Sequence, residues 1–236
     1  MQTFNANDFY ITNLSLSKNV RETHYDYDEI GNPLTIGNNT LTWINGRELN
    51  SFNDITFKYN KDSIRTSKVV NNKETKYYLE GNKIIFEKTD NNVIYYIRND
   101  IDDLVGFKYN DTNYYYVKNA QEDIIGILDS NNNVVARYEY DSWGNIIAIT
   151  DGNGNDISTN VGHIANINPF RYRSYYYDKE TNLYYLNSRY YNPVWGRFIN
   201  ADVFTTTGQD FAGNNMYLYA GNNFVVRVEI DGLFWF

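Results

Sequence analysis

Short runs of apolar and β-branched residues alternate along the chain with clusters of turn-forming residues, which return about every eight to twelve positions. Apolar and polar residues alternate in Lys83–Lys88 and in Val134–Asp141, and several strands carry apolar residues on both faces. Pairs such as Asn71–Asn72 supply the positive φ angles that hairpin turns need. The pattern predicts successive antiparallel β-hairpins, with room for a helical turn only around Ser188–Ala201 and Asn214–Tyr219.

Four segments repeat one arrangement, in which a tyrosine-containing strand leads into a turn rich in Asp or Asn and then into another strand. They are His24–Asn32, Phe57–Arg65, Phe107–Tyr116 and Arg137–Asn145. A repeat of roughly twenty residues corresponds to one hairpin, which cannot bury its own face and must stack on its neighbours. We therefore expect one continuous sheet that curves or spirals.

The composition supports an all-β fold and narrows the functions that the chain can have. The 236 residues include 24 Tyr and 13 Phe but only 3 Pro and 2 Met, a balance that favours pleated sheet. Formal net charge is −8, from 29 acidic and 21 basic residues. Surfaces that follow a phosphate backbone need clustered Lys and Arg, so a nucleic-acid partner is not expected.

The residue inventory also limits the chemistry. With no cysteine, the chain cannot hold disulfides, a thiolate nucleophile or a Cys-based zinc site. The stretch Asp151–Asp156 resembles a calcium loop but lacks the downstream glutamate, so no metal or cofactor is expected. The N-terminus has no signal-peptide pattern and no stretch has the apolar length of a membrane span, so we expect no membrane span and a cytoplasmic location before any export.

Several longer segments resemble the Rhs/YD-repeat proteins and their C-terminal Rhs repeat-associated core. The matching segments are Lys58–Ile85, Asp103–Ile146, His163–Asp202 and Asn215–Phe224. The resemblance implies a spiralling β-hairpin sheet, a partial shell or cocoon, closed by a C-terminal core that acts as a plug. On this basis, residues 1–160 are expected to form the repeats, and residues 161–236 the core, continuous with the same sheet.

The resemblance also implies a function. In Tc toxin C subunits and polymorphic Rhs toxins such a shell encloses a toxic C-terminal domain, whereas teneurins use a similar shell at the cell surface. We therefore expect a structural shell segment that encapsulates or presents a cargo and is secreted or displayed by a specialised route. Expected partners are the remainder of a shell or another copy of the chain, and a toxin cargo or toxin-complex subunit. The sequence stops soon after Leu233, so no cargo domain is expected within it.

The family core is similar to an aspartic protease that cuts its own chain with two aspartates and an arginine. The arginine of its S-R-Y-Y motif corresponds to Arg189, and the aspartate of its R-F-I-x-x-D motif corresponds to Asp202. Its second aspartate begins a D-P-x-G-L ending, where this chain has Glu229, one methylene longer. Asp231 is the alternate candidate and requires a shift of register. The departure from the motif suggests slow or absent cleavage.

Other interpretations stay open. The arginine and the acids can form an ion-pair network that fixes the plug in place, without chemistry. Arg171 and Arg173 are expected to stack on tyrosines and to pair with acids of the strands rather than to bind a ligand. An alternative function is a carbohydrate- or protein-binding scaffold that uses tyrosine-rich faces of the sheet. A glycosidase needs a carboxylate pair that the sequence gives no means of choosing.

Overall fold

Two antiparallel sheets make up the computed structural model, which describes residues 26–202, 215–223, 227, 229 and 232. The long sheet has thirteen strands in chain order: β1 Thr35–Ile36, β2 Asn39–Ile44, β3 Glu48–Phe52, β4 Ile55–Tyr59, β5 Arg65–Val70, β6 Lys73–Glu80, β7 Lys83–Thr89, β8 Asn92–Arg98, β9 Leu104–Tyr109, β10 Thr112–Lys118, β11 Ile124–Leu128, β12 Val134–Tyr140 and β13 Ile146–Thr150. The second sheet has four: β14 Tyr176–Asp178, β15 Leu183–Leu186, β16 Arg189–Asn192 and β17 Arg197–Phe198. Every strand pairs with its sequence neighbour, so the hairpin prediction is confirmed.

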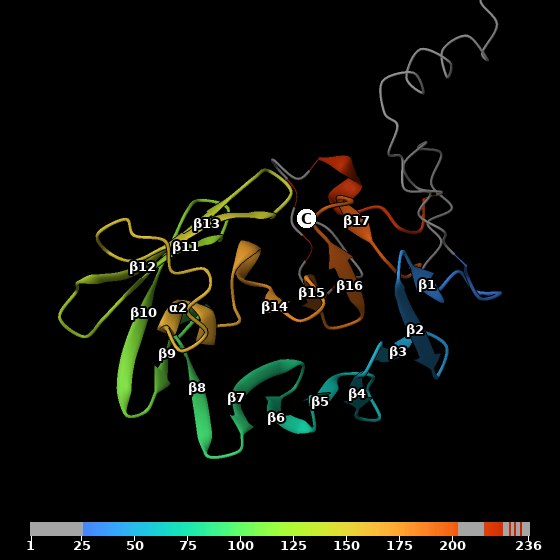
Figure 1. The fold of residues 1–236 in the computed structure, drawn as a ribbon, viewed down its shortest axis with the longest axis horizontal. Helices are drawn as coiled ribbons and strands as arrows, with labels where there is room; N and C mark the ends of the chain where they lie inside the picture. Colours follow the sequence, from blue (N-terminus) through green and yellow to red (C-terminus); the bar gives the residue numbers. More distant parts are fainter. Residues whose placement is uncertain (1–25, 203–214, 224–226, 228, 230–231, 233–236) are drawn as a thin grey trace, which may run out of the picture.

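The long sheet bends into an open arc, and the four-stranded sheet lies on its concave side (Figure 1). This confirms the all-β, spiralling hairpin fold with a partial shell around a C-terminal core. One detail differs from the expectation. The core strands are not hydrogen-bonded into the long sheet but form a sheet of their own, which we call the plug.

The longer connections of the long sheet share one geometry, illustrated by Asp141–Asn145. Asp141 N–H donates to the carbonyl of Asn145 at 3.0 Å, and Gly144 N–H donates back to the carbonyl of Asp141 at 3.0 Å. Asp141 Oδ1 also accepts from the amides of Trp143 and Asn145, at 2.9 Å each. The first position of the loop needs an Asp or Asn because its side-chain oxygen accepts hydrogen bonds from these two amides. The fourth residue of the loop has a positive φ. The same geometry occurs at Asp28–Asn32, Asn60–Ile64, Asn99–Asp103, Asn119–Asp123, Asp129–Asn133 and Asp151–Asn155.

The two rims of the long sheet differ, and the difference accounts for its curvature. One rim carries the connections β2–β3, β4–β5, β6–β7, β8–β9, β10–β11 and β12–β13. All six of these strand pairs have a register shift close to the connection. We call this the bulged rim. On the opposite rim, the first five connections are two-residue turns with unbroken register. Bulges bend strands and increase twist, so a sheet with bulges mainly along one rim curls.

Helical structure is scarce in the described residues. It consists of α2 Ile164–Ile167 and the 3-10 turns η1 Tyr172–Ser174 and η2 Ala220–Asn222. The helical turn expected within Ser188–Ala201 is wrong, because β16 and β17 occupy that stretch. No helix within the described part of the chain is long and apolar enough to cross a membrane.

One hydrophobic core joins the concave face of the long sheet to the plug. The inner face contributes buried residues such as Phe57 and Phe107, and the plug contributes Tyr176, Leu183 and Tyr190. The plug therefore occupies part of the concave side of the arc. The plug covers its apolar inner face, so sheet and plug share a core that neither has alone.

Candidate functional site

The plug is attached to the inner wall of the long sheet by a fully buried ion-pair cluster. Asp178, at the end of β14, accepts from Arg65 Nη1 at 2.5 Å and from Lys68 Nζ at 2.9 Å, both from β5. Lys68 also contacts Glu180 at 2.8 Å. Burial by itself raises the pKa of Asp178, but the adjacent charges of Arg65 and Lys68 bring it below its ordinary value. The carboxylate stays ionised and joins two elements distant in sequence.

Aromatic rings surround this cluster. The guanidinium carbon of Arg65 lies 4.2 Å from the ring centre of Tyr185 and 5.0 Å from those of Tyr77 and Tyr176. Tyr176 also donates its hydroxyl proton to the buried carboxylate of Glu87, in β7, at 2.8 Å. Rings of the sheet and of the plug thus enclose one cation, which stabilises the charge in place of water.

The bulged rim holds the plug mainly through backbone carbonyls. Two plug tyrosines donate to carbonyls of the loop between β12 and β13, Tyr191 to Trp143 at 2.8 Å and Tyr184 to Gly144 at 2.8 Å. Tyr172, in the η1 turn that leads into the plug, donates to Ser142 of the same loop at 3.1 Å. Elsewhere on this rim, Arg47 donates to the carbonyl of Ala201 at 2.5 Å. The loops that bend the sheet therefore also seat the plug, at one rim of the arc.

Arg189, Asp202 and Glu229, the three candidate residues of the family motif, lie together in the structure. Arg189 begins β16, and its Nη2 lies 3.0 Å from Asp202 Oδ2 and 3.8 Å from Glu229 Oε2. The side chains of Arg189 and Glu229 are 4% and 1% exposed, and that of Asp202 is 14% exposed. Asp231, the alternate candidate, lies outside the described residues. The geometry brings the three side chains within reach of one another, and a catalytic role stays a prediction.

Further contacts fix each member of this cluster. Ala220 N–H donates to Glu229 Oε1 at 3.2 Å, and the hydroxyl of Tyr175 both donates to the Glu229 carbonyl at 2.6 Å and accepts from its amide at 3.2 Å. Arg189 Nε donates to the carbonyl of Gly232, and the guanidinium lies 3.6 Å from the ring centre of Phe198. Sequence reasoning did not identify Tyr175, because its role depends on the fold and not on a motif.

The expectation for Arg171 and Arg173 holds only in part. Arg173 stacks on Tyr172 and pairs with Asp123, its Nε lying 3.6 Å from Asp123 Oδ1. Arg171 stacks on two tyrosines but has no carboxylate partner among the described residues. The same part of the chain contains no group of three or more His, Cys, Asp or Glu side chains suited to a metal ion.

Comparison with known proteins establishes the family. A family model described as the teneurin YD-shell matches residues 83–225, more than half of the chain. The chain belongs to the teneurin YD-shell family. The resemblance to the Rhs/YD-repeat proteins is thereby confirmed, and the arc and plug described above are a segment of a YD shell.

Relatives of this YD-shell segment include bacterial proteins named as tRNA nucleases. The chain is 36% identical to the tRNA nuclease WapA of Bacillus subtilis strain 168 over 242 residues, which cover 98% of the chain and 10% of that protein. It is 33% identical over 242 residues to the tRNA3(Ser)-specific nuclease WapA of Bacillus spizizenii, with the same coverage. The YD-shell segment thus spans about a tenth of the length of these relatives.

Solved structures agree on the fold. The structure of TcdB2-TccC3 without its hypervariable C-terminal region superposes with a TM-score of 0.68 at 20% identity, covering 88% of this chain and 11% of that one. The Photorhabdus luminescens Tc holotoxin pore superposes with a TM-score of 0.64 at 20% identity, covering 88% and 10%. At this identity, the likeness establishes the shell fold alone.

Proposed function

We propose that this chain is the plug-bearing segment of a YD shell that encapsulates or presents a C-terminal cargo. The observation that carries the proposal is the seating of the plug, which a buried ion-pair cluster and the bulged rim hold on the concave side of the arc. A shell needs a closed end to retain a cargo, and a plug held by buried charges resists displacement. The relatives named as tRNA nucleases and the shared fold of the Tc holotoxin pore support a toxin setting.

The nuclease activity named for WapA does not belong to this segment in our proposal. The chain matches a tenth of that protein, and its net charge of −8 disfavours binding to nucleic acid. The proposed partners are the remainder of a shell or a second copy of the chain, a toxin cargo and a toxin-complex subunit. The proposed location is secreted or at the cell surface by a specialised route.

The Arg189 cluster, in our proposal, fastens the plug and cuts the chain slowly or not at all. An aspartic dyad works because two adjacent carboxyls share one proton. Here one guanidinium nitrogen of Arg189 lies 3.0 Å from Asp202 Oδ2 and 3.8 Å from Glu229 Oε2, so the arginine bridges the two carboxylates. Glu229 is also one methylene longer than aspartate, and catalytic groups tolerate displacements of only about half an ångström. The longer side chain of Glu229 opposes the geometry that proton transfer needs, and the arginine bridge is what a structural network requires.

A reporter fused after Phe236 tests this proposal. Intact mass should show an uncut wild-type fusion, and Glu229→Asp combined with Ile230→Pro should increase any cutting near the junction. Asp202→Asn is the control, because it removes one carboxylate from the cluster without changing the size of the side chain much. Efficient cutting of the wild-type fusion that Asp202→Asn abolishes would contradict the proposal.

Self-association tests the proposed partners separately. On the outer edge of β13, Ile157 N–H pairs with the carbonyl of Ile149, whereas Ile147 has no main-chain partner on that edge among the described residues and is 65% exposed. Unpaired strand edges favour pairing with another chain. Sedimentation velocity should therefore show concentration-dependent association, and a strict monomer over a hundredfold range of concentration would count against a second copy as the partner.

The tyrosine faces give less support to the alternative, a carbohydrate- or protein-binding scaffold. Most of the plug tyrosines are buried, and the outer-face rings of Tyr78 and Phe86 stack on each other at 4.0 Å with 11° between their planes. Sugar rings stack on exposed aromatic faces, and these two rings already use faces to contact each other. We therefore place the shell function first.

A further inference from the structure

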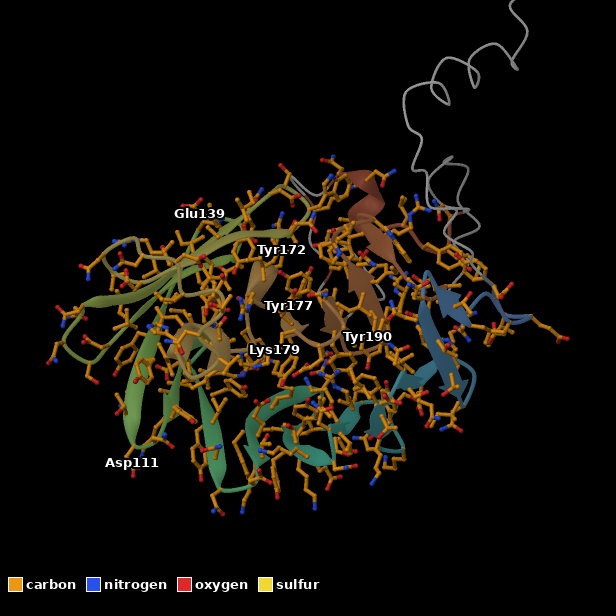
Figure 2. All side chains as sticks on the ribbon, in the orientation of Figure 1. Asp111, Glu139, Tyr172, Tyr177, Lys179 and Tyr190 are labelled. Carbon is orange, nitrogen blue, oxygen red and sulfur yellow. The ribbon has the colours of Figure 1, made fainter. Side chains whose placement is uncertain are left out.

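A groove of about 630 Å³ separates the inner wall of the long sheet from the segment that leads into the plug. Its walls come from β5 to β9 on one side and from residues 161–180 on the other. Tyr177 and Lys179, at the end of the first plug strand, lie inside the arc of the long sheet (Figure 2). The groove is distinct from the Arg189 cluster, and no residue of that cluster lines it.

Arg171 lines this groove as a buried cation with no counterion among the residues that the structure describes. The residue is 2% exposed, and its guanidinium lies 4.9 Å from the ring centre of Tyr138 and 5.3 Å from that of Tyr177. Its Nη2 donates to the carbonyl of Ala165 at 3.1 Å, while Nε and Nη1 have no hydrogen-bond partner in the described part of the chain. A buried guanidinium stays charged and is costly unless an anion or several acceptors compensate it.

Lys179 brings a second positive charge beside the first. Its Nζ contacts the carbonyl of Asn166 at 3.5 Å, and Asn166 follows directly after Ala165, which Arg171 contacts. Arg171 and Lys179 thus contact consecutive backbone carbonyls and line the same groove. Neither forms an ion pair with a carboxylate of the described residues.

The two acids that line the groove are engaged elsewhere. Glu87 accepts from the hydroxyl of Tyr176 at 2.8 Å, and Glu180 pairs with Lys68 at 2.8 Å. The groove is thus locally basic within a chain that carries a net charge of −8.

We propose that this groove binds an oxyanion, a phosphate or carboxylate group, between Arg171 and Lys179. The anion completes the pairing of the buried guanidinium and separates the two cations. A guanidinium fork matches the geometry of either group, and the ammonium of Lys179 at the groove edge supplies a point charge. The site depends neither on self-cleavage nor on enclosure of a cargo.

Calorimetric titration of the full chain at constant ionic strength tests the site, with inorganic phosphate, methyl phosphate and acetate as probes. We expect saturable binding of at least one probe. If methyl phosphate and inorganic phosphate bind equally, the site is assigned to a phosphate group on a larger molecule. If inorganic phosphate binds more tightly, the site is assigned to the free ion. Binding of acetate alone would assign it to a carboxylate.

Lys179→Gln is the decisive variant because the side chain is exposed and its replacement leaves the core intact. Loss of one charge-assisted contact should weaken binding about tenfold. Arg171→Met should abolish binding, and Lys179→Gln decides alone if that variant does not fold. Lys73→Gln is the matched control, since Lys73 lines the same groove but pairs with Asp90 at 3.5 Å, and should bind as wild type. Absence of saturable binding by all three probes, or unchanged affinity in Lys179→Gln, would overturn the proposal.

Discussion

At the scale of single residues, buried charges connect the two sheets. Arg65 and Lys68 are buried in β5, at positions where strands ordinarily carry apolar side chains. These two charged residues are the only sign of the ion-pair cluster in the sequence of that strand. Asp178 stands directly before a turn, and no motif around it marks a buried partner. Arg65 and Asp178 are 113 positions apart in the sequence, so neither the strand of Arg65 nor the strand of Asp178 predicts the ion pair by itself. By contrast, the positions of Arg189, Asp202 and Glu229 were indicated by a family motif.

Asp178→Asn should lower the free energy of unfolding at pH 7 by about 3–5 kcal/mol, because it leaves two buried cations without their shared partner. The pKa of Asp178 is lowered in the folded protein, so its contribution is present above the ordinary value of 3.8 and is lost as pH falls through the folded value. Urea unfolding should show a difference between variant and wild type that stays constant from pH 7 to pH 5 and shrinks only in strong acid. A cost below about 1 kcal/mol at pH 7 would contradict this.

Glu87→Gln should behave in the opposite way. Burial raises the pKa of Glu87 in the folded protein, and the hydrogen bond from Tyr176 offsets this only in part. Because the folded protein holds the proton of Glu87 more tightly, this group stabilises the fold most below pH 4.5, the pKa of the unfolded state. The contribution is lost as pH rises through the folded pKa. The variant should therefore be at least as stable as wild type at pH 7, and wild type should gain on it as pH falls toward 4.5. The raised pKa of Glu87 would be refuted if the stability of the variant, measured relative to wild type, were lower at pH 7 than at pH 4.5.

At the scale of elements, the sequence predicted the turns and a curved sheet, but not the direction of the curvature. Asn71–Asn72 was identified as a turn because it supplies two positive φ angles. The bulges beside the longer loops leave no such mark, since one extra residue in a strand does not change composition. Their restriction to one rim, with a single exception, emerges only when all strand pairs are aligned. The sequence therefore predicted hairpins but not the direction in which they curl.

Two loops of identical geometry provide a matched test of how the bulged rim seats the plug. Gly144 and Gly154 both have φ near +88°, but a Cβ at Gly144 would lie 2.6 Å from the ring of Tyr172, whereas at Gly154 it meets nothing within 4 Å. Gly154→Ala should cost about 1–2 kcal/mol, from the left-handed backbone alone. Gly144→Ala should cost about 1–3 kcal/mol more, because the ring must move. Equal costs in thermal unfolding would show that the loop does not support the plug.

At the scale of the whole molecule, the plug and the arc behave as one unit in this account. Their shared core leaves each with an exposed apolar face if the other is removed. The sequence and its family resemblance indicated a core at the C-terminal end, but the separate plug sheet and its seating on one rim required the structure. The boundary at residues 160 and 161 stays a prediction.

Native-state hydrogen exchange across low concentrations of urea tests most directly whether the plug and the arc unfold as one unit. Amides of β15, Leu183–Leu186, and of β6, Lys73–Glu80, belong to the plug and to the wall that faces it. If the plug is fixed in the arc, both sets should exchange through the same global opening, with one free energy and one dependence on urea. Exchange of the β15 amides through a separate opening of lower free energy, while β6 stays protected, would show a plug that detaches alone and would contradict the account.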